Sequence, residues 1–297
     1  SSTPVFASCN IGVKIVTPIT GMTFTEDKEL NQLGYGQEYQ IKYTLDPVDA
    51  TASLLTWTSD NPDMISVDKT GKLTTKAASA VITASYGPVV QNVTVTVADG
   101  RFWYSLGNGL GNGLDNNWYL DGNNASVVSS DGNKTTVQMG SGYRGDLWLA
   151  RSGKGKIVNV NPADYRYFAI KVGFKSQLVP GKNKPNGCIK LEIFDDGIKK
   201  IGPEYFGTGG DANNRYEILG ASEISTTEPN VLYYDLQSKY KTVTPTDWNQ
   251  VFDLSQCKFV IADFPETAQT YDLYWIRSFK SIEELQAFVD SENNTNE

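Results

Sequence analysis

Histidine is absent from the 297 residues of this chain, and its absence removes more chemistry than any motif adds. Catalytic triads of the Ser-His-Asp and Cys-His types, zinc sites built on histidine and proton transfer through imidazole are all excluded. Carboxylate chemistry remains open, because two acidic side chains can hydrolyse a glycosidic bond without histidine. The chain contains 34 acidic residues, but sequence alone does not give the separation of any two carboxyl groups.

Cysteine is scarce, and its odd count of 3 excludes a full disulfide framework. Cys188 and Cys257 each begin a strand-like segment and could pair across neighbouring strands, but we expect buried free thiols. Cys9 stands in the run FASC, which is similar to the end of a lipoprotein signal, although no apolar core precedes it in this sequence.

Long apolar runs are also missing, since none reaches the roughly 18 residues needed to cross a bilayer. The balance of 26 basic and 34 acidic residues gives a net charge of −8, which disfavours nucleic acid and anionic lipid and favours neutral ligands. No signal peptide opens the sequence, so we expect a mature ectodomain in which residues 1–10 form a tether. An arbitrary starting point is equally compatible with this opening.

The residues that are present favour an all-β protein. Aromatic residues make up 11% of the chain, with 16 tyrosines and 6 tryptophans, and helical periodicity is nearly absent. Glycine and asparagine gather in turn-like segments. Because 297 residues is about twice the length of a typical domain, we expect two domains, each with its own core.

Residues 45–97 show strand chemistry interrupted by turn chemistry. Apolar residues alternate toward one face at Leu55, Trp57, Ile65, Val67, Leu73, Ile82, Ala84, Val93, Val95 and Val97. A type I turn is expected at 68–71, where Gly71 can take positive φ, and Gly87-Pro88 marks the next hairpin. The pattern predicts a short antiparallel sandwich with Trp57 at its centre.

This segment resembles the bacterial group 2 immunoglobulin-like domain through the runs DPVDAT, LTWTSDNPDMISVD and GKLTTKAA. The paired cysteines of antibody domains are absent. The resemblance covers residues 11–98 and implies an immunoglobulin-like spacer of a surface or secreted protein. A run rich in glycine and asparagine follows, and we interpret 99–113 as a linker or surface loop, since it lacks the Lys-Ser/Thr ending of a phosphate-binding loop.

Residues 101–290 predict a second, larger β-sandwich of the jelly-roll type. Strand-like segments lie at 147–151, 168–172, 189–193, 231–236, 258–264 and 271–279, and Asp131-Gly132-Asn133 predicts a hairpin turn. A short helix is expected at the end, where Ser281 and Glu284 form a capping box and Leu285 and Phe288 an apolar face. We expect the polar residues 291–297 to be disordered.

The closing run TYDLYWIRSFKSIEELQAFV is similar to the C-terminal signature of an uncharacterised family in surface lipoproteins of gut anaerobes. The likeness extends over NNWYLDGNNASV and GYRGDLWLARS. Members resemble carbohydrate-binding-module-like or galactose-binding-like jelly rolls and accompany an immunoglobulin-like spacer in polysaccharide-utilisation systems. The resemblance implies a non-catalytic glycan-binding protein at the cell surface or outer membrane. Its expected partners are a polysaccharide or oligosaccharide and an outer-membrane glycan transporter, with no nucleic acid and no membrane contact beyond an N-terminal lipid anchor.

A glycan site needs an exposed aromatic ring that stacks on a sugar and planar polar side chains that bond its hydroxyl groups. Loop and loop-edge residues supply both, and the candidate ligand-binding residues are Trp118, Tyr143, Arg144, Asp146, Trp148, Tyr205, Arg215 and Trp248. Arg144 and Asp146 could instead form a surface ion pair. Trp118 stands in a polar, turn-rich run, and we leave open whether its ring is a platform or part of the core.

Trp148 faces solvent if its neighbours Leu147 and Leu149 face the core, and the reverse assignment is equally compatible with the spacing. Trp103 is expected to pack at the domain junction and Trp275 in the core.

No cofactor is expected. Asp195-Asp196-Gly197 has oxygen ligands that could hold a structural calcium ion, but a simple hairpin turn explains the run better. Two other functions stay open beside glycan binding. One is a glycoside hydrolase that uses two carboxylates, and the other is an adhesin or assembly module that presents an apolar patch to a protein partner.

Overall fold

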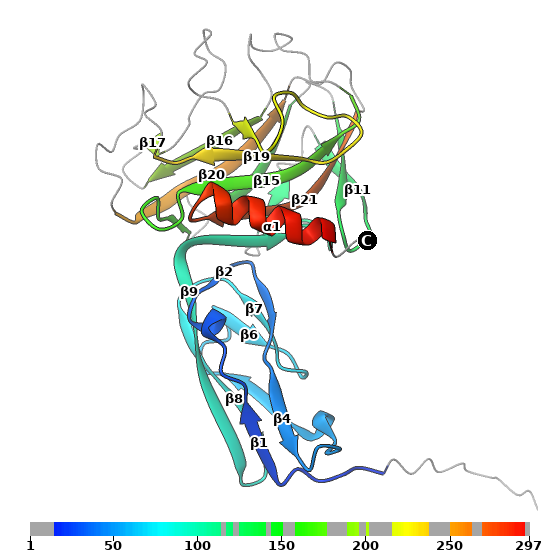
Figure 1. The fold of residues 1–297 in the computed structure, drawn as a ribbon, viewed down its shortest axis with the longest axis vertical. Helices are drawn as coiled ribbons and strands as arrows, with labels where there is room; N and C mark the ends of the chain where they lie inside the picture. The colour runs from blue at the N-terminus through cyan, green and yellow to red at the C-terminus, as the bar shows by residue number, and fades with distance from the viewer. Residues whose placement is uncertain are drawn as a thin grey trace, which may run out of the picture.

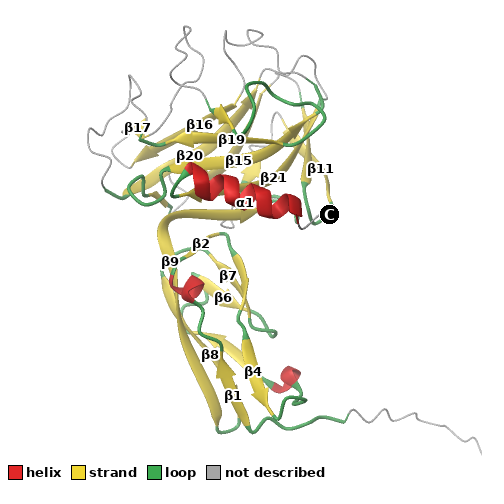
Figure 2. Cartoon of the chain, viewed as in Figure 1, coloured by secondary structure: helices red, strands yellow, loops and turns green. Residues whose placement is uncertain are grey.

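The chain consists of two β-rich domains arranged end to end, the N-terminal one below and the larger C-terminal one above in Figure 1. This computed structural model describes residues 15–113, 117–120, 125–140, 144–150, 158–176, 189–195, 200–201, 216–237, 250–262 and 269–294. Among these residues the only α-helix is a short one at the C-terminal end (Figure 2). The prediction of an all-β chain with a larger second sandwich and a short final helix is confirmed.

The N-terminal domain is built from short strands around a small core. These are β1 (Gly21–Phe24), β2 (Leu33–Tyr35), β3 (Glu38–Gln40), β4 (Tyr43–Asp46), β5 (Thr56–Ser59), β6 (Ile65–Val67), β7 (Lys72–Thr75), β8 (Ser79–Tyr86) and the first half of β9 (Val89–Ser105), with 3-10 turns η1 (Lys28–Asn31) and η2 (Ala52–Leu54). β1 pairs with β4, β7 lies between β3 and β6, and β8 lies between β5 and β9.

Trp57 occupies the core of this domain, as the alternation predicts. Its ring stacks on Phe24 with a centroid separation of 5.8 Å, and Ile65, Leu73 and Ile82 are fully buried. The Asp68 carboxylate accepts from the Thr70 amide at 2.7 Å and Gly71 takes a φ of 83°, which confirms the expected turn. Assignment of this sandwich to the immunoglobulin-like family stays a prediction.

Strand β9 belongs to both domains. Its first half, from Val89 to Thr96, pairs with β8, whereas Trp103 to Ser105 pair with β21 (Thr270–Phe279) of the C-terminal domain. β2 runs parallel to it across the junction (Figure 1). The prediction of a linker at 99–113 is therefore wrong for residues 99–105, which are strand; the following glycine-rich residues 106–113 form a loop.

The C-terminal domain is a sandwich of two antiparallel sheets. Its elements are β10 (Tyr119–Leu120), β11 (Ala125–Ser130), β12 (Thr135–Met139), β13 (Arg144–Ala150), β14 (Asn159–Val160), β15 (Tyr167–Phe174), β16 (Ile189–Asp195), β17 (Lys200–Ile201), β18 (Glu217–Ile218), β19 (Asn230–Asp235), β20 (Phe252–Ala262), β21 and α1 (Ile282–Asn294). One sheet has the order β10-β13-β20-β16-β17. The other has the order β18-β19-β15-β21, beyond which β12 and β9 share the free edge of β21.

The core of the sandwich is aromatic. Phe168 lies 4.6 Å from Phe102 and 5.7 Å from Phe259 between ring centroids, so rings from both sheets meet in the middle. Cys257 of β20 is a free, fully buried thiol, and burial raises its pKa above the ordinary value. The expectation of a buried free cysteine is confirmed at this position, while Cys9 and Cys188 lie outside the described residues.

Helix α1 lies across the β15–β21 sheet (Figure 1) and begins as its capping box predicts. The Glu284 amide donates to Ser281 Oγ at 3.2 Å, as predicted, whereas the Glu284 carboxylate accepts from the amide of Lys280 at 2.6 Å, one residue before the Ser281 amide that a capping box uses. Leu285 is fully buried and Phe288 packs on Trp275. The helix continues to Asn294, so the prediction of a disordered tail is wrong for residues 291–294. No helix in the described ranges is long and apolar enough to span a bilayer.

Candidate functional site

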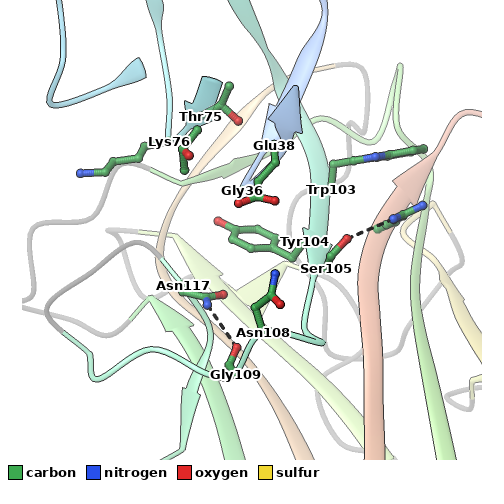
Figure 3. A pocket seen from close by; sticks show the side chains of 12 residues that line it. Gly36, Glu38, Thr75, Lys76, Trp103, Tyr104, Ser105, Asn108, Gly109 and Asn117 are labelled. Carbon is green, nitrogen blue, oxygen red and sulfur yellow. Dashed lines mark hydrogen bonds between the residues drawn. The ribbon is translucent and has the colours of Figure 1, made fainter. Parts of the chain in front are cut away.

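A cleft of about 480 Å³ opens where the two domains meet (Figure 3). We call it the junction cleft. The N-terminal domain contributes Gly36, Glu38, Thr74, Thr75 and Lys76, and the C-terminal part contributes Trp103, Tyr104, Ser105, Asn108, Gly109, Asn117 and Arg277. Its volume lies within the range of roughly 300–1,000 Å³ that is typical of small-ligand sites.

Glycines of the β2 segment allow the two domains to approach each other closely at this cleft. A β-carbon at Gly34 would lie 2.6 Å from Cβ of Trp103, and one at Gly36 would lie 2.2 Å from Cδ1 of Tyr104. Gly36 also has a φ of 73°, which side-chain-bearing residues rarely adopt. The Tyr104 ring therefore lies on bare backbone and forms the floor of the cleft, where it is only 3% exposed, and its hydroxyl is directed between Thr75 and Asn117 in Figure 3.

Arg277 forms a cationic wall of the cleft on the C-terminal side. Its guanidinium carbon lies 4.4 Å from the ring centroid of Trp103 and 4.3 Å from that of Phe288. Nη2 donates to Ser105 Oγ at 3.3 Å, whereas Nε is buried and has no hydrogen-bond partner. The pKa of Arg277 is lowered to about 10, mainly because the guanidinium is buried.

Three further polar side chains of the cleft come from two loops and one strand. Asn108 is exposed, and Asn117 donates through Nδ2 to the Gly109 carbonyl at 3.5 Å. Glu38 on β3 forms an exposed ion pair with Lys72 at 2.8 Å. Amides, a carboxylate and cations thus lie over a floor formed by a tyrosine ring, a mixture that can both donate to and accept from a hydroxyl-rich ligand.

Trp118, a sequence-predicted platform, is part of the core instead. Its side chain is completely buried, lying 6.0 Å from Tyr104 edge to face and 5.6 Å from Phe259 between ring centroids. The platform prediction is therefore wrong for this residue, because the indole is enclosed by rings from β9 and β20 and presents no face to a sugar.

Asp146 and Trp148 come together on the outer side of β13, on either side of one lysine of β20. Lys258 Nζ lies 3.0 Å from the Asp146 carboxylate and 4.5 Å from the centroid of the Trp148 ring. Trp148 has an exposed fraction of only 6%, although Leu147 and Leu149 face the opposite side and are fully buried. Trp148 therefore points away from the leucines, as one interpretation of the spacing requires, but its side chain is still buried. Asp146 pairs with Lys258.

Four other candidates, Tyr143, Tyr205, Arg215 and Trp248, lie outside the described residues, and of Arg144 only the backbone in β13 is described. The calcium candidate Asp195-Asp196-Gly197 lies outside them apart from the backbone of Asp195 in β16. Among the described residues no group of three potential metal ligands occurs. Trp103 packs at the domain junction and Trp275 is buried, both as predicted.

The sequence alone does not reveal the junction cleft. It places Asn108 and Gly109 in a linker and gives no reason to single out Lys76 or Arg277. Three segments distant in sequence, around residues 36–38, 74–76 and 103–117, meet Arg277 only because β9 is shared between the domains. The signal that points to the cleft is the pair of glycines in LGYG (33–36) beside an aromatic strand.

Residues 109–285 match a family described as a domain of unknown function, DUF4979. The chain belongs to the DUF4979 family. This DUF4979 region begins inside the loop that lines the junction cleft and includes Asn117 and Arg277, but not Trp103, Tyr104 or any residue of the N-terminal domain. No curated protein matches the chain.

One solved structure similar to this chain is described by the words "Structural basis for the promiscuous specificity of the carbohydrate-binding modules from the beta-sandwich super family". The two are 12% identical, the match covers 87% of this chain and 97% of that one, and the TM-score is 0.31. A likeness of this size carries no argument about the function of the DUF4979 chain.

Proposed function

We propose that this protein is a non-catalytic glycan-binding protein whose binding site is the junction cleft. The observation that carries the proposal is the composition of the cleft, in which the half-buried Trp103 lies with the amides of Asn108 and Asn117 and with charged side chains over a floor formed by the buried Tyr104. A sugar presents apolar C–H faces and a ring of hydroxyl groups, so it binds where an aromatic surface and fixed hydrogen-bonding groups occur together.

The same composition favours binding over hydrolysis. Glycoside hydrolases use a pair of carboxyl groups on either side of the scissile bond. Within the described lining of the cleft the acidic side chain is Glu38, and its carboxylate is paired with Lys72. We therefore expect no release of reducing ends when the protein is incubated with a polysaccharide that it binds.

The proposal extends to the setting of the protein. The two resemblances support a location on the cell surface within a polysaccharide-utilisation system, an N-terminal lipid anchor and a neighbouring glycan transporter. They also support an immunoglobulin-like fold for the N-terminal domain. Because Gly36, Glu38 and Lys76 line the cleft, this domain would serve as one wall of the binding site as well as a spacer.

A glycan panel followed by titration calorimetry tests the site. We expect at least one oligosaccharide to bind, and we expect Asn108→Ala to weaken it about tenfold through the loss of its hydrogen bonds. Asn294→Ala, which removes an exposed amide at the end of α1, is the matched control and should leave the affinity unchanged. Absence of binding to every glycan would refute the function, and binding that is indifferent to Asn108→Ala would refute the site.

A further inference from the structure

The junction cleft has a local charge that is opposite in sign to that of the whole protein. The chain has a net charge of −8, yet two cations, Lys76 and Arg277, line the cleft. Its one described carboxylate, Glu38, is directed toward Tyr104 in Figure 3 and is paired with Lys72 at 2.8 Å. The net charge of the sequence favours neutral ligands, but a ligand responds to the field inside the cleft, where positive charge is in excess.

Neither cation forms an ion pair within the part of the chain that the structure describes. Glu292 raises the pKa of Arg277 through its charge, but its carboxylate bonds to Lys171 at 3.1 Å and to Trp275 Nε1 at 3.0 Å. The guanidinium of Arg277 contacts two aromatic rings and donates to one hydroxyl group. Its buried Nε donates no hydrogen bond to the described residues.

A guanidinium that is held in a fixed plane and has an unused N–H donor is well suited to bind an oxyanion. The rings of Trp103 and Phe288 fix the plane of the Arg277 side chain, so less conformational freedom is lost when it binds a ligand. A partly desolvated arginine gains more from a carboxylate or sulfate than from a neutral hydroxyl group, because charge-assisted hydrogen bonds are about twice as strong as neutral ones.

We propose that the junction cleft selects acidic glycans. Arg277 binds a carboxylate or sulfate group on one sugar of such a glycan. Lys76 lines the cleft on the side opposite Trp103, with its ammonium group directed away from Tyr104 in Figure 3, and it would attract a second acidic sugar of the same chain on that side. This inference rests on the proposed function and adds the class of ligand. Asn108, Asn117 and the half-buried Trp103 would contact the parts of the ligand that acidic and neutral sugars share.

Matched pairs of oligosaccharides test the charge preference directly. One arm compares tetragalacturonate with its carboxyl-reduced form, and the other compares a sulfated galactan oligosaccharide with its desulfated form. We expect the acidic member of one pair to bind at least about tenfold more tightly, with a preference that decreases at high salt. The arm in which the preference appears distinguishes a carboxylate from a sulfate ligand.

Three variants then assign the preference to residues. Arg277→Lys keeps a positive charge but loses the planar fork, and we expect it to weaken the acidic ligand about tenfold while the neutral counterpart changes little. Lys76→Ala should also reduce the preference, and Lys69→Ala, an exposed lysine of the same domain, should not. If Arg277→Lys melts at a much lower temperature, Lys76→Ala carries the test, because its side chain is only half-buried.

The outcomes separate the two proposals. Equal affinity for the acidic and neutral members of both pairs would overturn the inference while leaving glycan binding intact. An unchanged preference in both Arg277→Lys and Lys76→Ala would also overturn it. Failure of every oligosaccharide to bind, neutral ones included, would instead overturn the proposed function.

Discussion

The ring of Tyr104 lies so close to the backbone of Gly36 that a β-carbon at this glycine would stand 2.2 Å from Tyr104 Cδ1. At this point the two domains are in contact through the backbone of Gly36 on one side and the ring of Tyr104 on the other. The contact fixes the position of the ring at the floor of the junction cleft, and it makes the cleft dependent on how the domains are held together.

Gly36→Ala should destabilise the protein by about 2–4 kcal/mol, since the added methyl group meets both a strained φ of 73° and the Tyr104 ring. Gly87→Ala is the matched control, because Gly87 also has positive φ but nothing lies within 4 Å of the added carbon. We expect the control to cost about 1 kcal/mol. Urea unfolding of both variants measures the difference, and equal costs would contradict the proposed contact.

The junction is also held by a buried hydrogen-bond network around Asn159. Its Oδ1 accepts from the Tyr35 hydroxyl at 2.7 Å and from the Gly100 amide at 2.7 Å, so that Asn159 of β14 is bonded to β2 and to β9. Asn159→Ala leaves both donors unsatisfied and should cost about 2–4 kcal/mol, whereas Tyr35→Phe should cost about 1 kcal/mol. Denaturant unfolding gives these values. Tyr86→Phe, at a tyrosine whose hydroxyl has no hydrogen bond to the described residues, should cost less than either.

The lysine between Asp146 and Trp148 should behave as a buried charge. Asp146→Asn removes the carboxylate that neutralises Lys258 and should cost about 3 kcal/mol, while the double variant Asp146→Asn/Lys258→Met should recover most of that loss. Lys72→Met, which breaks an exposed pair, should cost less than about 1 kcal/mol. Denaturant unfolding of the three variants measures these costs. A double variant that is less stable than Asp146→Asn would contradict the prediction of a buried, paired charge.

Stability should decrease in acid partly through Asp272. Burial alone would raise the pKa of this carboxyl group, but hydrogen bonds from Lys134, Thr136 and Lys175 outweigh it and hold the pKa below its ordinary value of 3.8. A lowered folded-state pKa means that the stabilisation is complete above the unfolded-state pKa and is lost as pH falls through the folded-state value. Asp272→Asn should therefore show a weaker dependence of unfolding free energy on pH below 3.8 than the wild type. Asp49→Asn, at an exposed position, should follow the wild type.

Trp118→Phe should lower stability by about 1–2 kcal/mol and leave glycan affinity unchanged, because the indole fills the core and contacts no open surface. Thermal unfolding and titration calorimetry on the same preparation check both statements. A stable variant with weakened binding would support the platform interpretation that the sequence leaves open.

The sequence predicts those features that depend on local spacing. The alternation that buries Trp57 and Ile82, the turn at Asp68 and the cap at Ser281 all follow from residues a few positions apart. Trp148 shows the limit of this reasoning. Alternation separates it correctly from Leu147 and Leu149, but both sides of β13 are enclosed, so facing away from the core does not mean facing solvent.

Long-range contacts decide the features that the sequence does not reveal. Trp118 has polar neighbours along the chain, yet its ring meets Tyr104 of β9 and Phe259 of β20. The junction cleft likewise depends on pairing between β9 and β21 across more than half of the chain. No local pattern encodes which of several tryptophans such pairings enclose.

The shared strand β9 has a consequence for where this protein can be divided. The DUF4979 match begins at residue 109, although Trp103 to Ser105 of β9 supply hydrogen-bonding partners for residues 275–277 of β21. In a fragment that starts at residue 109, the backbone N–H and C=O groups of that stretch of β21 would lose their hydrogen-bonding partners on β9. Unpaired strand edges of this kind pair with strands of other molecules and promote aggregation. The smallest unit that keeps this edge closed begins before residue 103, so the family match and the hydrogen-bonded sheet begin at different positions in this chain.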